Sequence, residues 1–323
     1  MSLTQHFEVT HWVGYNFFCV FALLSSCFAI LSAAWLLTRI GKTKIHSSIK
    51  LLLIFVFNSS AIQSASVLKN YSSYIVQFVS QSDPLVVLMG ECSFVRNVYL
   101  VFNIFVTLSH LIFAIVVFLG TINVSSKRLL QAVVLILSFV AFLAAIAIVL
   151  FLLKIKDPDE LQPHCLSISG SSLGDAFYSY MYLGQAVIDG VVCAVLFIMV
   201  RVNRNKRANY NTNLSTKLEC ERNLTALFQS APVVAITAAL TVVSIFGAFV
   251  LRHFQESMTP AEYKYYAYFF FIGPHIPLLQ NIIFIVIFRK QWNKVNKVAN
   301  PKEDGLKADE QLNKAWKCQA SKF

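Results

Sequence analysis

Long apolar stretches separated by short polar segments recur along this chain. Seven of them are long enough to cross a bilayer, because a membrane-spanning helix needs roughly 20 mainly apolar residues. They cover residues 13–37, 49–69, 96–120, 129–153, 176–201, 229–251 and 265–288. One such stretch is also typical of a buried helix in a soluble protein, but seven in series favour a membrane protein. The pattern predicts an all-α membrane protein with a seven-transmembrane helix bundle.

Composition agrees with this interpretation, since 57% of the 323 residues are hydrophobic and only 13% are charged. A soluble domain usually carries about 25% charged residues. Residues 1–12 contain no Lys or Arg, and no clear small-residue cleavage site follows the first stretch. We therefore expect an uncleaved first helix rather than a signal peptide.

The distribution of basic residues predicts the orientation in the membrane. Segments 38–50, 120–130, 201–222 and 289–323 hold 4, 2, 6 and 9 of them, or 21 of the 27 Lys and Arg. Basic residues gather on the cytoplasmic side. We expect residues 1–12 to be extracellular, 13–288 to form the transmembrane domain and 289–323 to be cytoplasmic, as in a plasma-membrane protein. The net charge of +11 then reflects topology, and no nucleic-acid partner is expected.

Just after the seventh stretch, the chain continues with an amphipathic pattern. Between residues 288 and 299, apolar residues recur at spacings of 4, 3 and 4, opposite three lysines. This pattern predicts a short basic eighth helix along the inner leaflet. Pro301 would end it, and the polar remainder is expected to be disordered.

Two of the seven cysteines, Cys92 and Cys165, lie in predicted outer segments, where disulfides form. A bond between them would tie the loop after the fourth helix to the start of the third. The alternative is two free thiols. His164 is the only obvious further ligand nearby, and a structural zinc site needs four, so we expect no metal. The sequence indicates no cofactor either.

Two motifs resemble a known family. The stretch SDPLVVLMGECSFVR (82–96) resembles the approach to helix three in nematode serpentine chemoreceptors of the Sra/Srab kind. The stretch LSTKLECERN (214–223) resembles their element leading into helix six. The resemblance implies a G-protein-coupled-type receptor that binds a small molecule in its bundle and signals through cytoplasmic loops. It also implies a heterotrimeric G protein as partner and a sensory cilium as location.

The chain departs from common receptors at two places. Helix three ends near Gly120 and Thr121 without an acid–arginine pair, and helix seven lacks the N-P-x-x-Y motif. The class of G protein, the ligand and the oligomeric state therefore do not follow from the sequence. Alternatives to the receptor are a small-solute transporter and a receptor-like membrane scaffold that does not couple.

Polar residues in the third and fifth stretches recur every three or four positions, which places them on one face of each helix. Such faces normally turn to the bundle interior, because charge in lipid is costly. The members are Arg96, Tyr99, Asn103, Thr107 and His110 in the third stretch, and Tyr178, Tyr182, Gln185 and Asp189 in the fifth.

We predict that the outer members bind the ligand, namely Arg96, Tyr99, Asn103, Tyr178, Tyr182 and Gln185. The alternative is that they hold the helices together by hydrogen bonds. Asp189 and His110 lie deeper, about 20 Å from the outer helix ends. We expect these two to approach each other, directly or through water, as a structural or switching pair.

Three further features complete the predictions. Pro274 and Pro277 should kink the seventh helix, and His275 between them would bond to a carbonyl that they free. Asn70 begins the one N-x-S/T site predicted on the outer side, a possible glycosylation site. No HExxH, GxSxG or paired-acid constellation occurs, so we do not expect an enzyme.

Overall fold

The computed structural model of the chain describes most of its helical part. The described residues are 13–41, 47–80, 87–88, 90–122, 127–152, 159, 161–162, 174–208, 214–254, 257–259, 262–263, 266–267 and 272–298. The predicted extracellular N-terminus, Cys165 and the predicted disordered tail lie outside them. The chain forms two compact units, Met1–Ile282 and Ile283–Phe323.

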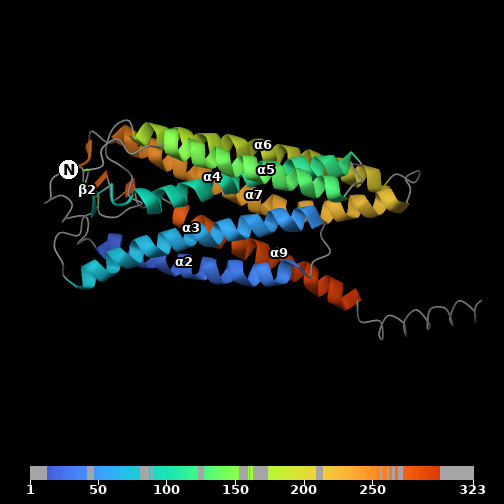
Figure 1. Ribbon diagram of the computed structural model, residues 1–323, viewed down its shortest axis with the longest axis horizontal. Coiled ribbons are helices and arrows are strands. Elements are labelled where there is room, and N and C mark those ends of the chain that lie inside the picture. Colours follow the sequence, from blue (N-terminus) through green and yellow to red (C-terminus); the bar gives the residue numbers. More distant parts are fainter. Residues whose placement is uncertain are drawn as a thin grey trace, which may run out of the picture. The chain divides into compact units, whose positions relative to one another are not determined.

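Long helices dominate both units, as the apolar stretches predict (Figure 1). They are α2 (Val13–Ile40), α3 (Ser47–Val79), α4 (Ser93–Thr121), α5 (Lys127–Ala147), α6 (Gly174–Ala208), α7 (Leu214–Phe254) and α9 (Ile276–Val298). A π-helical segment, Ile148–Leu152, extends α5. Among the described residues, six helices are long and apolar enough to cross a membrane, and a seventh, Gly273–Arg289, is shorter. The protein is a multi-pass membrane protein.

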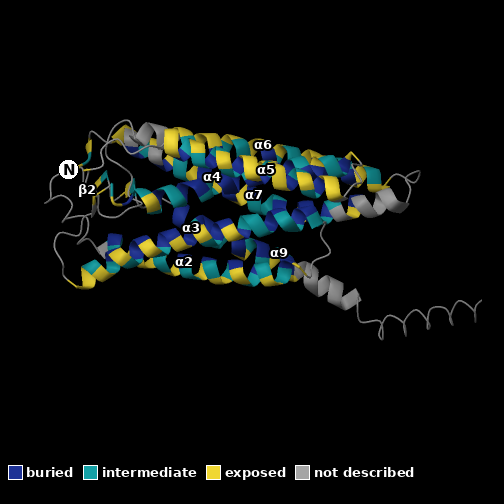
Figure 2. Ribbon diagram, viewed as in Figure 1, coloured by how far each residue is buried: buried dark blue, intermediate teal, exposed yellow. Residues whose placement is uncertain are grey.

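Helix α4 is the most buried of these helices. In the first unit it packs against α3, α5, α6 and α7, while α2 packs on α3 and α6 on α7. Large apolar side chains on α5, α6 and α7, such as Phe139, Phe197 and Phe246, are exposed (Figure 2). Exposed apolar faces around a buried central helix are expected where lipid surrounds the helices. The polar residues of α4 therefore face other helices.

Two short strands lie beside the start of α4. Strand β1 (Val87–Leu88) pairs antiparallel with β2 (Leu161–Gln162), with Val87 opposite Gln162. The pairing joins the segment before α4 to the segment between α5 and α6. Cys92, the residue that caps α4, is buried and forms a disulfide. The predicted partner, Cys165, is outside the described residues.

Helix α3 extends ten residues beyond the predicted end at residue 69, to Val79. The prediction stopped there because Lys69 and Asn70 are polar. In the structure Lys69 is exposed, whereas Tyr71 and Tyr74 continue the buried face. Asn70 is therefore a buried residue inside a helix, 5% exposed, and not the start of an outer loop.

The amphipathic helix predicted after the seventh stretch is helical in the structure as far as Val298, and it continues α9. Helix α9 runs without interruption from Ile276 to Val298, so the amphipathic segment is its C-terminal part. The physical reason is that no Gly or Pro occurs between Pro277 and the end of α9 to break it.

At the start of α9, Pro274 lies in a 3₁₀ turn, Gly273–His275, and Pro277 lies in the first helical turn. A proline is tolerated there because the first N–H groups of a helix have no partner within it. In place of the predicted kink within the seventh helix, the structure has a 3₁₀ turn directly before α9. His275 does not bond a freed carbonyl; its Nδ1 lies 3.0 Å from Ser25 Oγ of α2, and its ring contacts Phe18 and Phe21.

Outside the spanning helices, a reciprocal cap closes the turn at Thr259. The Thr259 N–H and hydroxyl both donate to Glu262 Oε2, at 2.8 and 3.0 Å, and the Glu262 N–H donates back to Thr259 Oγ1 at 3.2 Å. These bonds to the charged carboxylate lower the pKa of Glu262.

Candidate functional site

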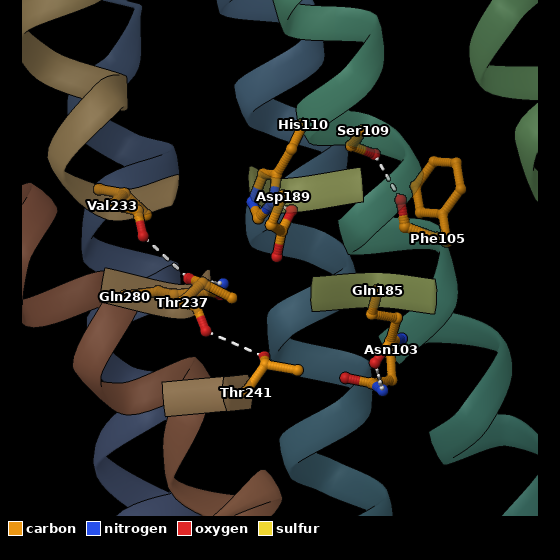
Figure 3. Close-up of polar contacts among 10 residues, drawn as sticks. All are labelled: Asn103, Phe105, Ser109, His110, Gln185, Asp189, Val233, Thr237, Thr241 and Gln280. Atoms are coloured by element: carbon orange, nitrogen blue, oxygen red, sulfur yellow. Dashed lines mark hydrogen bonds and ion pairs between the residues drawn. The ribbon is translucent and has the colours of Figure 1, made fainter. Parts of the chain in front are cut away.

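A buried polar contact joins α4 to α6. His110 Nδ1 lies 2.9 Å from Asp189 Oδ1, and the two residues are 5% and 0% exposed (Figure 3). The predicted approach of these residues is therefore confirmed, and the contact is direct. The second carboxylate oxygen, Asp189 Oδ2, is buried without a hydrogen bond among the described residues.

A relay of side-chain amides crosses the bundle closer to the start of α4. Gln63 Nε2 on α3 donates to Asn103 Oδ1 on α4 at 3.2 Å, and Asn103 Nδ2 donates to Gln185 Oε1 on α6 at 3.4 Å. Gln185 Nε2, at the end of the relay, is buried and has no partner within the described residues. The structure thus brings Asn103 and Gln185 together as the polar stripes predict.

Gln63 was missed by the sequence analysis. It lies in the stretch FNSSAIQSAS, whose several polar residues point in different directions around the helix. Gln63, Ser60, Ser64 and Val67 are all buried, at spacings of three and four. That spacing was the available signal, because it marks a single face turned to α4.

Above the relay lie the residues that were expected at the outer mouth of the site. Tyr99 is buried beside Gln63 and Tyr182, and Tyr182 interacts electrostatically with Arg96. Arg96 itself is only 6% exposed. The side chain of Tyr178 is outside the described ones, although its backbone belongs to α6. Five of the six predicted ligand-binding residues therefore line one interior face between α4 and α6.

A second polar cluster, also missed from the sequence, surrounds Asn281 of α9. Its Nδ2 donates to the Ala29 carbonyl and to Ser32 Oγ, both at 3.0 Å, and lies 3.5 Å from Ser60 Oγ. The cluster therefore joins α2, α3 and α9. The signal was the Gln–Asn pair at 280–281, in an otherwise apolar helix.

The neighbouring residue Gln280 makes a separate contact. Its Nε2 donates to Thr237 Oγ1 of α7 at 2.9 Å (Figure 3). The Thr237 hydroxyl donates to the Val233 carbonyl, and the Thr241 hydroxyl donates to the Thr237 carbonyl, so both bond within α7. The amide of Gln280 thus joins α9 to α7 through a satisfied neutral contact.

Hydrogen bonds from an amide and from a lysine join the predicted cytoplasmic end of α4 to α6. Asn203 Nδ2 donates to Thr121 Oγ1 at 2.9 Å and to the Met199 carbonyl at 2.8 Å. Lys206 Nζ donates to the Thr121 carbonyl at 2.6 Å, at the helix C-terminus where a positive charge is favourable. These contacts occupy the region where common receptors carry an acid–arginine pair.

Helix α7 approaches the same end of α4 at a glycine. A Cβ atom added to Gly120 would lie 3.2 Å from both Nδ2 and Oδ1 of Asn223, closer than an ordinary contact. The absence of a side chain at Gly120 therefore permits the close approach of α7. A surface contact of 3.5 Å between Arg207 and Glu221 also joins α6 to α7.

Metal binding was examined among the described residues. Within them, no group of three or more His, Cys, Asp or Glu side chains is arranged to hold an ion. The chemistry available in the interior is hydrogen bonding by amides, hydroxyls and the His110–Asp189 pair.

The fold and the interior site define a multi-pass membrane protein of the seven-helix receptor class. The chain belongs to the family described as serpentine type 7TM GPCR receptor class ab chemoreceptor, whose model matches residues 8–314. The resemblance seen in the sequence motifs is thereby confirmed, and the family is one of receptors rather than enzymes.

Among curated proteins, the chain is similar to "Serpentine receptor class alpha-39" of Caenorhabditis elegans. The two are 28% identical over 211 residues, which cover 64% of this chain and 56% of the relative. The similarity therefore spans little more than half of the relative's length.

Proposed function

We propose that the protein is a chemosensory receptor of the plasma membrane that binds a small molecule inside its bundle and activates a heterotrimeric G protein. The observation that carries the proposal is the convergence of polar side chains from three helices on one interior site. Gln63, Asn103 and Gln185 form a relay, with Arg96 and Tyr182 on its outer side. The predicted orientation would open this site to the outside and, in a sensory neuron, to the ciliary surface.

The composition of this site supports ligand binding over simple helix association. Interhelical hydrogen bonds between membrane helices contribute only about 0.6 kcal/mol on average. Gln185 keeps a buried amide donor that no described residue accepts. An open donor next to aromatic and amide groups is typical of a binding site.

The His110–Asp189 pair supports a means of transmission. It lies one to two helical turns below Asn103 and Gln185 and joins the same two helices, α4 and α6. A ligand that favours one packing of α4 against α6 would shift the population of helix arrangements. We assign the pair the role of a switching contact between the ligand site and the cytoplasmic ends.

At the cytoplasmic ends, α7 is the helix that we expect to move. Its contact with α4 is the close approach of Asn223 to Gly120, which holds no salt bridge. Its cytoplasmic beginning, residues 214–223, would present the LSTKLECERN element to a partner. Displacement of α7 from Gly120 would expose the ends of α4 and α6 to a G protein.

A cellular assay of G-protein activation tests the proposal. The full chain would be expressed with a panel of G-protein biosensors and exposed to a panel of volatile and water-soluble small molecules. We expect a response to some of them, and its loss in Asn103→Leu at equal surface expression. Ser109→Ala is the matched control, because among the described residues the Ser109 hydroxyl bonds to the Phe105 carbonyl of its own helix and to no other group. A response that is unchanged in Asn103→Leu would argue against this site.

The predicted sidedness needs its own measurement. An epitope tag at the N-terminus should bind antibody on intact cells, and a tag at the C-terminus should need permeabilised cells. The reverse result would place the polar site at the cytoplasmic side and remove the proposal.

A further inference from the structure

We propose that Gln185 donates a hydrogen bond to a carbonyl oxygen of the ligand, so that the receptor's ligand is a small neutral carbonyl compound. This inference rests on the proposed function and names the chemistry of its ligand. It starts from Gln185 Nε2, a buried donor on α6 that has no hydrogen-bond partner among the described residues. The residue is 7% exposed, so this N–H is shielded from water outside the bundle.

The relay fixes which atom of Gln185 remains open. Gln63 Nε2 donates to Asn103 Oδ1, so the other end of the Asn103 amide, Nδ2, is the end that donates to Gln185 Oε1. If the Gln185 amide were turned over, its N–H would lie against the N–H of Asn103. The carbonyl end of Gln185 is therefore held by Asn103, and the end that remains for a ligand is a donor.

Along α4, the relay lies midway between residues that can carry charge. Arg96 is seven residues before Asn103 and His110 is seven residues after it, which is about 10 Å along the helix in each direction. Figure 3 shows Gln185 directed to Asn103, whereas Asp189, one turn further along α6, is directed to His110. A group bonded to Gln185 Nε2 is therefore bound at the uncharged part of the site.

This position disfavours a charged ligand group. The electrostatic interaction of Arg96 is with Tyr182, one turn before Gln185 on α6. A carboxylate bound to Gln185 would be buried without a contact to that guanidinium, which is costly. An ammonium has donors only and would oppose the Gln185 N–H. The group that Gln185 recognises is therefore neutral.

Among neutral groups, a carbonyl matches the open atom best. It accepts from the Gln185 N–H and carries no proton of its own that needs an acceptor. A hydroxyl carries such a proton, and the two amide oxygens of the relay next to it, Asn103 Oδ1 and Gln185 Oε1, each accept a hydrogen bond already. The open oxygen Asp189 Oδ2 belongs to the contact with His110, deeper on α4. A hydrocarbon would leave the donor unpaired.

The experiment compares four probes that share a six-carbon chain and differ at its second carbon: 2-hexanone, 2-hexanol, 2-aminohexane and 2-methyl-1-hexene. In the last, a CH₂ group replaces the carbonyl oxygen. Thermal unfolding of the detergent-purified full chain is measured with each probe in wild type, Gln185→Met and Ser109→Ala. Comparison of the proteins at equal probe concentration removes the effect of the probe on the micelle. Ser109→Ala is the matched control, since among the described residues this hydroxyl bonds to the Phe105 carbonyl and to no other group.

We expect 2-hexanone to raise the melting temperature of wild type most. That advantage should disappear in Gln185→Met and remain in Ser109→Ala. Loss of the hydrogen bond should weaken the apparent affinity for 2-hexanone about tenfold. The affinity for 2-methyl-1-hexene should not fall in Gln185→Met, because this probe accepts no hydrogen bond from Gln185.

An infrared measurement tests the same bond without a variant, and it decides if Gln185→Met fails to fold. Difference spectra between unlabelled and carbonyl-labelled 2-hexanone isolate the carbonyl stretch of the bound probe. Donation of a hydrogen bond by Gln185 should lower its frequency below that of 2-hexanone in hexane. A bound carbonyl that absorbs at the hexane frequency would overturn the inference.

Failure of this inference is distinguishable from failure of the proposed function. If 2-hexanol, 2-aminohexane or 2-methyl-1-hexene stabilises wild type as well as 2-hexanone does, or if Gln185→Met keeps the preference, the carbonyl inference is overturned and the receptor stands. The same holds if cells respond to small molecules but 2-hexanone causes no shift. If no small molecule acts in either assay, the proposed function itself fails.

Discussion

The close contact between Gly120 and Asn223 allows a quantitative test of how α7 packs on α4. Gly120→Ala adds one methyl group 3.2 Å from the nitrogen and the oxygen of the Asn223 side chain. Insertion of a methyl group into a packed site costs about 1–3 kcal/mol. Replacement of a helical glycine by alanine gains about 0.5–1 kcal/mol in propensity, which acts in the opposite direction.

Gly190→Ala on α6 is the matched control. A Cβ atom at Gly190 would meet nothing within 4 Å, so this change carries the propensity gain without the steric cost. The propensity terms of the two variants cancel in the comparison. We therefore expect Gly120→Ala to be less stable than Gly190→Ala by about 1–3 kcal/mol.

The measurement is reversible denaturant unfolding of the full chain in mixed micelles, followed by tryptophan fluorescence. Repeating Gly120→Ala in an Asn223→Ala background completes a double-mutant cycle. Removal of the Asn223 side chain should abolish most of the steric cost. In the proposed receptor, Gly120→Ala should also raise G-protein activation without ligand, because it separates α7 from α4.

Two results would refute this reasoning. Equal stability of Gly120→Ala and Gly190→Ala would mean that Asn223 does not lie against Gly120. A steric cost of the same size with and without the Asn223 side chain would place the clash elsewhere. Either result would also remove the argument that α7 is held at this glycine.

Three further predictions concern other parts of the chain. Cys92→Ser and Cys165→Ser should each lower the free energy of unfolding by roughly 2–4 kcal/mol, with no further loss in the double variant; additive losses would show that they are not bonded to each other. Removing His110 or Asp189 alone should cost roughly 3–5 kcal/mol, and replacing both by leucine should cost less than the sum. Additive costs in that cycle would disprove the coupling. Asn70→Gln should leave the gel mobility of protein made in eukaryotic cells unchanged, because Asn70 is buried; sensitivity of wild type to N-glycosidase would contradict this.

Helical periodicity was sufficient to predict the contacts between α4 and α6. Asn103 and His110 are two turns apart on α4, and Gln185 and Asp189 are one turn apart on α6. Both stripes had to face the interior, and α4 and α6 are neighbours in a bundle of this class. The pairing of His110 with Asp189 then follows from their similar depth.

Periodicity did not predict the contacts of a helix that has polar residues on several faces. It also did not predict where a helix ends or begins when no Gly or Pro marks the place. In α3, serines and amides on several faces concealed that Gln63 lies toward Asn103. The end of α3 was misplaced because an exposed Lys69 was taken for the membrane boundary. Amphipathicity predicted the helix after the seventh stretch, but it did not predict that this helix continues α9.

The contacts of Asn281 could not be predicted from the sequence either. Asn281 reaches across to α2 and α3 only because α9 begins at the 3₁₀ turn formed with Pro274, which sets the rotation of the helix. A sequence pattern assigns a residue to one face of its helix. It does not predict toward which neighbouring helix that face turns, because this rotation depends on how the helices pack.

The lack of a described salt bridge between α4 and α7 has a consequence for switching. A ligand can shift a two-state equilibrium only by its differential affinity for the two states, and moving it from 1:99 to 99:1 needs about 5.5 kcal/mol. A typical hydrogen bond contributes only about 1 kcal/mol net, so a few hydrogen bonds to a ligand, plus burial of a short alkyl chain, approach that requirement. Breaking a buried salt bridge by removing one partner costs about 3–5 kcal/mol, most of what such a ligand supplies. The described contacts between α4 and α7 contain no salt bridge, and those at Thr121 that join α4 to α6 are hydrogen bonds to a hydroxyl and a carbonyl. In the proposed receptor, a small neutral ligand would therefore separate α7 from α4 only if it made nearly all of its contacts in one of the two states, with the His110–Asp189 pair intact in both.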